Sequence, residues 1–423
     1  MKQMRFLLVV FIFLAFMPTS LRAEEVLSWM DCVKEAAKNH PDLIAAQEVI
    51  KQSQAAKGVT ASALYPQIDS SLSASTAKTA GATGSYTADS YQYGLTGTQL
   101  IFDAGKTMSG VKAASENIIA SKQGFKFTSA TVRFRLRSAF IDLLKAQEAL
   151  KITKDIFDIR KQNYELISLR YYSGLEHKGA LLTAEASLAQ AKYGMSQAER
   201  ELVVARREMV KEMGRANMAP LEAKGDFGVR VAVDDKPDLQ VIASKNPSLL
   251  QLIAQKNAAE FNLKAAYASF SPALNGQAGI NKGGSNWPPK GDEYDLGLTL
   301  SMPVFEGGLR TSQVAQARAT LNQLKENERS TLDGLILKLQ QTWSALQNAV
   351  DNVKVKEKSL QANTERSKIA QLQYSTGFVT FDNWTIIEDN LVQAKQDYLN
   401  AEAAALLAEA NWIQAKGETL EYE

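Results

Sequence analysis

The chain has 423 residues, of which 45% are hydrophobic and 22% charged, and its formal net charge is +2. This balance is typical of a folded protein and excludes a chain that is disordered for lack of apolar residues. The charge also lacks the strong basic excess of nucleic-acid-binding proteins, so no nucleic-acid partner is predicted.

The first 23 residues predict a secretory signal peptide. Lys2 and Arg5 precede an apolar run over residues 6–16, and Ala23 offers a small residue for cleavage. A membrane anchor is the alternative, but this run is shorter than the ~20 residues that a spanning helix needs. Removing Lys2, Arg5 and Arg22 lowers the basic count from 48 to 45 against 46 acidic residues, which gives a mature net charge of −1.

Residues that could carry chemistry are sparse. Cys32 is the single cysteine, which excludes an intrachain disulfide, and its position predicts a buried small hydrophobe. His40 and His177 are the only histidines, and neither has neighbours in the sequence that would complete a metal site. No phosphate-binding loop or catalytic triad pattern is present. We therefore predict no enzymatic activity, no metal and no cofactor.

The chain is an internal duplication. Pro41 and Pro66 return as Pro247 and Pro272 with a shift of 206, and beyond the next loop the shift becomes 203 and stays constant. The pairs at 203 include Gly94 and Gly297, Phe102 and Phe305, Gly105 and Gly308, Tyr171 and Tyr374, Gly174 and Gly377, and Gly214 and Gly417. A register held over so many positions predicts two structural repeats, over residues 24–217 and 246–423.

Each repeat begins with a helix and continues into a β-hairpin. The helices are predicted at about 41–64 and 247–270, with proline at the first position of each. Apolar and polar residues then alternate over about 67–102 and 273–304. Period-two alternation predicts strands with one apolar and one polar face, two in each repeat.

Long helices follow each hairpin. Apolar residues recur every seven positions, as in the series Leu136, Leu143, Leu150, Phe157, Tyr164 and Tyr171, and a second series starts at Leu181. This repeat predicts left-handed coiled helices at about 106–170 and 175–215, and at about 308–373 and 378–417 in the second repeat. The segment 218–245, with Pro220 and Pro237, is predicted to connect the repeats across the outside of the helices.

Four strands with an apolar face cannot close a barrel alone, because the open edges would leave backbone groups unpaired in a bilayer. Other copies of the chain must complete them. Three chains would supply twelve strands and two chains eight, and the residues do not choose between these solutions.

The duplicated order of these features resembles the TolC-like outer-membrane efflux proteins. The resemblance covers the mature chain and depends on the hairpin breaks at Arg170, Tyr171, Gly174, Tyr374 and Gly377 and on two strand-to-helix junctions. The junctions are Phe102, Asp103 and Gly105, and Phe305, Glu306 and Gly308. The resemblance implies an α+β membrane protein: a homotrimer whose tandem-duplicated protomers each give four transmembrane strands to a 12-stranded barrel, which coiled-coil helical hairpins continue as a periplasmic tunnel.

The resemblance further implies a passive exit duct in the outer membrane, in contact with outer-membrane lipid, for a tripartite efflux or type I secretion system. A periplasmic adaptor protein would contact the five tip residues, and an inner-membrane pump of RND, ABC or MFS type would supply energy. A periplasmic adaptor is the alternative identity, but an adaptor would show one hairpin with compact β-rich domains. A structural coiled coil on the cell surface would leave the alternating strands unexplained.

Relatives often place an aspartate six residues after each turn glycine, to narrow the tunnel entrance. Here these positions hold Ala180 and Asn383. An acidic constriction is instead predicted from four nearby carboxylates: Glu176, Asp382, Glu388 and Asp389. The alternative is that they are solvated acids at helix starts, which the helix dipole favours.

Overall fold

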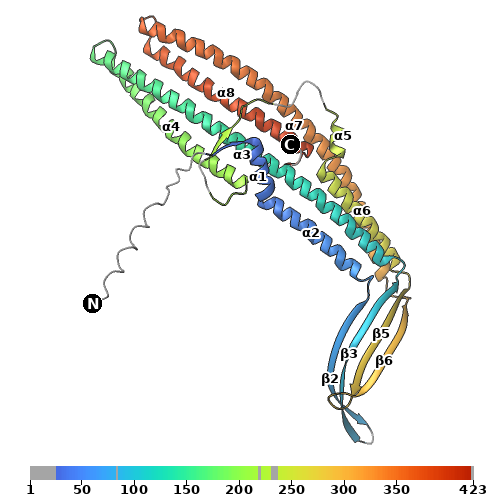
Figure 1. The fold of residues 1–423 in the computed structure, drawn as a ribbon. Coiled ribbons are helices and arrows are strands. Elements are labelled where there is room, and N and C mark those ends of the chain that lie inside the picture. The colour runs from blue at the N-terminus through green and yellow to red at the C-terminus, as the bar shows by residue number, and fades with distance from the viewer. Residues whose placement is uncertain (1–24, 82–83, 218–220, 230–236, 421–423) are drawn as a thin grey trace, which may run out of the picture.

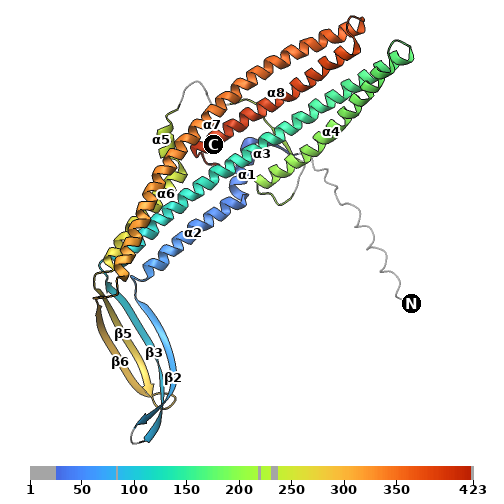
Figure 2. The same cartoon turned by 180° about the vertical axis from the view of Figure 1, so that it is seen from behind.

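The computed structural model describes residues 25–81, 84–217, 221–229 and 237–420. The predicted signal peptide lies outside the described residues. The molecule is elongated, with a β-sheet at one end and long helices that run from it to the opposite end (Figure 1). The view from behind shows the same division (Figure 2).

The sheet contains strands from both repeats. Strands β2 (Gln67–Gly81) and β3 (Gly84–Phe102) form the first hairpin, and β5 (Ala273–Gly284) and β6 (Gly291–Ser301) form the second. All pairings are antiparallel in the order β2-β3-β5-β6, so β2 and β6 are the edges. The second hairpin ends at Ser301 rather than at the predicted residue 304, because Pro303 has no backbone N–H to continue the ladder.

Each repeat supplies one helix that runs the length of the helical region. They are α3 (Lys106–Tyr172) and α7 (Leu309–Ser375), each of 67 residues. A rise of 1.5 Å per residue gives each a length of about 100 Å. Helix α3 packs against α2 (Pro41–Ser62) and α4 (Lys178–Glu212), and α7 packs against α6 (Pro247–Ala268) and α8 (Phe381–Lys416). Contacts of α3 with α6 and α8 join the two repeats.

The shorter helices meet near the middle of the long ones (Figure 1). His40 caps the start of α2, where its Nδ1 accepts a hydrogen bond from the Asp42 N–H at 3.1 Å. Its Nε2 lies 3.5 Å from Glu212 at the end of α4. In the second repeat the Asn246 side chain caps α6 and donates to the Ala415 carbonyl of α8 at 3.0 Å. We call these two contacts, His40 with Glu212 and Asn246 with Ala415, the helix joints. They lie at equivalent positions of the two repeats, but the first is an ion-pair contact and the second a neutral hydrogen bond.

Several short elements near these joints, which we call the belt, were not predicted from the sequence pattern. Strand β1 (Glu25–Ser28) pairs in parallel with β4 (Leu221–Lys224), and helix α1 (Trp29–Asn39) follows β1. The described part of the connector also holds α5 (Leu239–Ser244), which contacts α7. The other connector residues, 218–220 and 230–236, lie outside the described residues.

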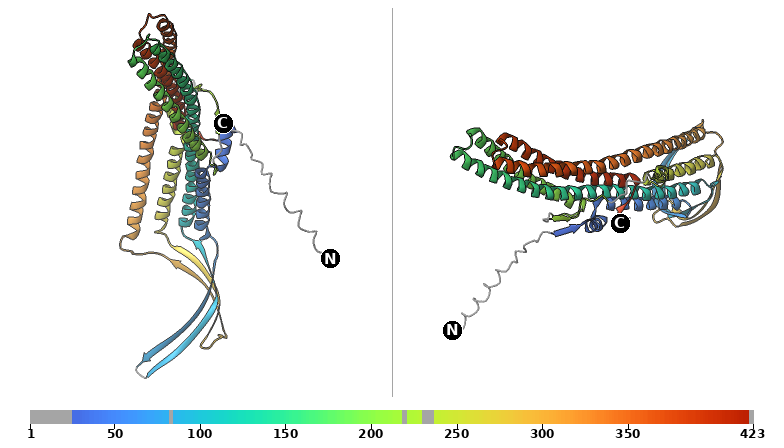
Figure 3. Two further views of the ribbon diagram at one scale, coloured as in Figure 1. Left: turned by 90° about the vertical axis from the view of Figure 1, so that its left-hand side faces the viewer. Right: turned by 90° about the horizontal axis from the view of Figure 1, so that it is seen from above.

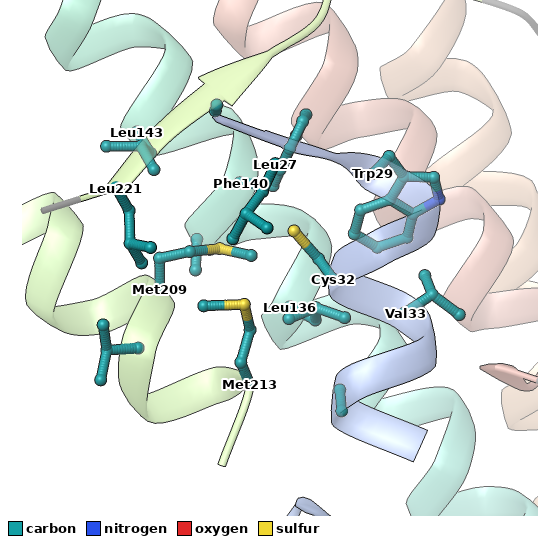
Figure 4. Close-up of a cluster of buried hydrophobic side chains, with 14 of the residues drawn as sticks. Leu27, Trp29, Cys32, Val33, Leu136, Phe140, Leu143, Met209, Met213 and Leu221 are labelled. Carbon is teal, nitrogen blue, oxygen red and sulfur yellow. The ribbon is translucent and has the colours of Figure 1, made fainter. Parts of the chain in front are cut away.

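The largest hydrophobic cluster lies beneath this belt. Trp29 and Cys32 of α1 pack with Leu136 and Phe140 of α3 and with Met209 of α4 (Figure 4). Cys32 is fully buried, and burial raises the pKa of its thiol to about 12. The cluster therefore packs β1, α1 and β4 of the belt against α3 and α4.

Candidate functional site: the helical tips and the two-faced sheet

Both helical hairpins reverse through the same turn. The Leu175 N–H donates to the Arg170 carbonyl at 2.8 Å, and the Gly174 N–H donates to the Tyr171 carbonyl at 3.0 Å. Phe378 and Gly377 make the equivalent bonds to Gln373 and Tyr374, at 2.9 and 3.2 Å. These are Schellman motifs, and they need a left-handed residue, which the glycines supply with φ of 75° and 83°. The predicted helix breaks therefore lie at the free ends of the hairpins.

The second tip holds a buried aromatic cluster. The Tyr374 side chain is only 3% exposed and stacks on Trp384, with ring centroids 4.5 Å apart. Phe381 packs edge-on against both rings. Ile167, Ala180 and Ala184 of the first hairpin complete the cluster. This cluster is an apolar contact between the two tips, and its member Tyr374 is one of the predicted tip residues.

Polar residues of the first tip surround the same tyrosine. The Tyr374 hydroxyl donates to Glu176 Oε1 at 2.7 Å, and the Arg170 guanidinium lies over the tyrosine ring, 5.0 Å from its centroid. Arg170 Nε is also 3.9 Å from the same Glu176 oxygen. Burial, assisted by the hydrogen bond to Glu176, raises the pKa of Tyr374 above its ordinary value. The structure thus brings together Arg170, Tyr374 and Glu176, whereas Tyr171 packs on its neighbour Tyr172.

A second polar contact joins the hairpins farther from the tips. Arg160 of α3 donates to Asp389 of α8 at 2.5 Å; the Arg160 side chain is buried and that of Asp389 is 64% exposed. The neighbouring Glu388 is buried and accepts a hydrogen bond from Ser367 at 2.5 Å. Arg160 is a residue that sequence reasoning missed, because a lone arginine in a long helix carries no pattern that marks it as buried.

The four carboxylates of the predicted constriction therefore occupy different environments. Glu176 binds Tyr374, Glu388 is buried against Ser367, and Asp389 pairs with Arg160. Asp382 is exposed at the start of α8, and within the described residues it has no ion pair.

The strand-to-helix junctions are held by local polar contacts and by a left-handed glycine. Asp103 accepts hydrogen bonds from the N–H groups of Gly105 at 3.0 Å and Thr107 at 2.7 Å, which fixes the first turn of α3. Glu306 pairs with Arg310 at 2.5 Å in the second repeat. Gly105 and Gly308 adopt left-handed φ values of 80° and 88° as the chain enters each long helix. Phe102 and Phe305 lie at the helix end of the sheet with exposed side chains.

The sheet has two chemically different faces. One face carries exposed apolar side chains from all four strands: Ile68, Leu72, Tyr93, Leu95, Ile280, Tyr294, Leu296, Leu298 and Leu300. The opposite face carries mainly serine, threonine, asparagine, glutamine and glycine. That polar face also holds three carboxylates, Asp69, Glu293 and Asp295, and among the described strand residues it holds no lysine or arginine.

Within the described ranges, no cluster of three or more histidine, cysteine, aspartate or glutamate side chains could hold a metal ion. No helix in the same ranges is sufficiently long and apolar to serve as a membrane span.

Comparisons with known proteins agree with this arrangement. The chain is 22% identical to the probable outer membrane lipoprotein SilC of Salmonella typhimurium and 21% identical to the outer membrane efflux protein BepC of Brucella suis. These alignments cover 91% and 88% of this chain, and 84% and 83% of the relatives.

Solved structures of the same fold include the Campylobacter jejuni CmeC outer membrane channel, with a TM-score of 0.82 at 18% identity, over 93% of this chain and 86% of that one. The outer membrane protein VceC of Vibrio cholerae gives 0.80 at 18% identity, over 92% and 96%. The predicted α+β fold is confirmed, and the periplasmic-adaptor alternative receives no support. The sequence profile of the outer membrane efflux protein family matches residues 32–215 and 239–418. The chain belongs to the outer membrane efflux protein family.

Proposed function

We propose that this protein is the passive outer-membrane exit duct of a tripartite exporter, with its sheet in the outer membrane and its helices in the periplasm. The observation that carries the proposal is the two-faced open sheet. Its apolar face suits lipid, its polar face suits water, and its edges β2 and β6 are free to pair. An unpaired strand edge in a bilayer costs several kcal/mol for each backbone group, so copies of the chain must join edge to edge.

We favour a homotrimer with a 12-stranded barrel and a helical tunnel below it. The resemblance to TolC-like proteins supports three copies, and the gentle bend of the long helices along their length is consistent with one segment of a tube wall (Figure 3). The duct itself performs no covalent chemistry and binds no cofactor. Transport is by diffusion through the polar lumen, and the energy comes from an inner-membrane pump.

Reconstitution tests this proposal. Protein purified from outer-membrane fractions should have three times the mass of the mature chain and should form discrete ion channels in planar bilayers. An adaptor would give no channels, and a particle with two copies would replace the 12-stranded barrel with an eight-stranded one.

The helical tips are proposed to contact a periplasmic adaptor. Exposed apolar side chains support this role: Tyr172 is 80% exposed and Phe378 is 84% exposed, and Leu169, Leu175 and Leu372 are also exposed. Exposed apolar groups at the end of a rod are typical of a protein-binding surface. Replacing Leu175 and Phe378 with serine should abolish export in cells while leaving the conductance of the purified channel unchanged. Retention of export would contradict the adaptor contact.

An acidic entrance constriction is proposed around Asp382, because it is the exposed and unpaired member of the four candidate carboxylates within the described chain. Asp382→Ala should reduce block of the channel by divalent cations added from the helical side. Glu388→Ala should not reduce it, because Glu388 is buried. Unchanged block in Asp382→Ala and in a further Asp389→Ala variant would exclude the constriction.

A further inference from the structure

The polar face of the sheet has glycines beneath its charged side chains. Gly279 of β5 and Asp295 of β6 are direct Cα partners across the antiparallel ladder. Gly279 is buried although its neighbours Ala278 and Ile280 are exposed. A methyl group built on Gly279 would overlap the Asp295 carboxylate, both oxygens and the carbon that carries them. The Asp295 side chain therefore lies across the glycine instead of standing away from the sheet.

Two amides hold the carboxylate in this position. Asn281 Nδ2 lies 3.3 Å from Asp295 Oδ1, and Gln277 Nε2 lies 3.4 Å from Asp295 Oδ2. These two residues flank Gly279 on the same face of β5, since side chains two positions apart share a face. The carboxylate thus receives a long hydrogen bond from each side and lies parallel to the strand.

The same arrangement recurs one step farther from the helices. A methyl group on Gly283 would lie 2.8 Å from Glu293 Oε1, and Gln92 Nε2 lies 3.4 Å from Glu293 Oε2. In addition, the Asn281 side chain lies over Gly94 of β3. Three polar side chains in one area of the sheet therefore lie flat over a glycine of the adjacent strand.

Side chains in strands normally stand roughly perpendicular to the sheet. On the polar face of a closed barrel, a carboxylate that stood perpendicular to the sheet would project into the lumen. Each copy of the chain would add one such carboxylate at each of these positions. We propose that Gly279 and Gly283 are positioning residues that lay Asp295 and Glu293 against the barrel wall and so keep the outer part of the duct wide. This inference rests on the proposed function, because it requires the polar face to line the lumen.

The test measures the width of the duct where these residues lie. Thr299 is on the polar face between Asp295 and the helices, so a reagent from outside must pass Asp295 to reach it. Thr299→Cys would be labelled on intact cells with neutral polyethylene glycol maleimides of graded size. The native Cys32 is fully buried and does not compete. Adding Gly279→Ala should abolish labelling by the largest reagent that enters the parent protein and leave labelling by the smallest unchanged.

A second substitution distinguishes displacement of the Asp295 carboxylate from narrowing of the duct by the added methyl group itself. Asp295→Ala in the Gly279→Ala background should restore labelling by the large reagent, because no carboxylate remains to be displaced. Gly297→Ala is the matched control: it adds a methyl on the same face of β6, with no described atom within 4 Å of it. An unchanged size limit in Gly279→Ala, failure of the rescue, or an equal loss in Gly297→Ala would each overturn the inference.

Folding is monitored by recovery of the oligomer from the outer membrane. If Gly279→Ala does not assemble, Gly283→Ala replaces it, with Glu293→Ala as its rescue. If position 299 of the assembled parent is never labelled from outside, the proposed lumen itself is wrong. Labelling of the parent with no effect of either alanine refutes only the role of the glycines.

Discussion

The two helical tips have the same backbone and different side chains, and the difference shows how a duplicated chain can specialise. Both turn through a Schellman motif with a left-handed glycine. Tyr171 and Tyr374 each lie three positions before the glycine of their tip. Yet Tyr374 is buried in an aromatic cluster with Trp384, whereas Tyr171 is half-buried and contacts the exposed Tyr172.

Three equivalent positions explain the contrast. The first tip has Arg170, Glu176 and Lys178 where the second tip has Gln373, Val379 and Phe381. The first tip therefore offers charge and the second offers apolar surface, and the two meet at Tyr374. Arg170 covers its ring and Glu176 accepts its hydroxyl hydrogen. The buried Tyr374 site thus needs residues from both tips, and neither repeat could form it alone.

The largest expected effect comes from removing the tyrosine ring at each tip. Tyr374→Ala deletes a buried aromatic side chain, and such deletions cost about 3–5 kcal/mol. Tyr171→Ala removes a partly exposed ring and should cost under about 1 kcal/mol. Hydrogen–deuterium exchange of the tip segments would measure both losses. Equal effects on exchange at the two tips would show that burial of Tyr374 does not make it the more stabilising of the two tyrosines.

A smaller difference is expected from the contact between Arg160 and Asp389. The equivalent positions in the other repeat hold Asn363 and Ala186, so the pair exists only once. Asp389→Ala leaves the buried Arg160 without its partner, which costs about 1–3 kcal/mol. Arg160→Asn leaves an exposed aspartate that water can solvate, at under about 1 kcal/mol.

Thermal unfolding of the reconstituted oligomer would rank these two variants. Asn363→Ala is the matched control, because Asn363 is partly exposed and bonds only to Ser359 of its own helix among the described residues. A larger loss of thermal stability in Arg160→Asn than in Asp389→Ala would contradict the prediction. It would mean that the cost does not come from leaving the buried guanidinium without a partner.

The smallest effect is expected from the hydroxyl of Tyr374. Tyr374→Phe keeps the stacking on Trp384 and removes one hydrogen bond to Glu176, which is worth about 0.5–1.5 kcal/mol. Because the pKa of Tyr374 is raised in the folded protein, its contribution is complete below the ordinary tyrosine pKa of about 10 and is lost as pH rises toward the folded value. The wild-type tips should therefore loosen at alkaline pH.

Tyr374→Phe should remove that part of the alkaline loss, and Tyr171→Phe should leave it intact. Hydrogen–deuterium exchange at two pH values, one near neutral and one above about 10, would show the difference. Identical alkaline loosening in wild type and Tyr374→Phe would mean that another group causes it.

Much of the molecule followed from local patterns in the sequence. The alternation along the strands, the heptad series and the turn glycines depend on neighbouring residues, and the structure places these elements within a few residues of the predicted bounds. The constant shift of 203 between the repeats fixed which residues would be equivalent. The predicted tip residues lie at the free ends of the helices for the same reason, because a left-handed glycine ends a helix whatever surrounds it.

Other features required the three-dimensional arrangement. The belt strands β1 and β4 are four residues each and pair across almost the whole first repeat, so no local period could reveal them. Glu388 and Asp389 are adjacent in sequence, yet one is buried and the other exposed, because α8 presents one face to α7 and another to solvent.

Two copies of a strand pair and a long helical hairpin can be read from the chain alone, since period and repeat are properties of the sequence. Packing in three dimensions selects which of two equivalent tyrosines is buried, which carboxylates have partners and which glycines lie beneath a carboxylate. Those outcomes depend on contacts between residues that are distant in sequence, such as Glu176 with Tyr374, and such contacts form only after the two hairpins pack together.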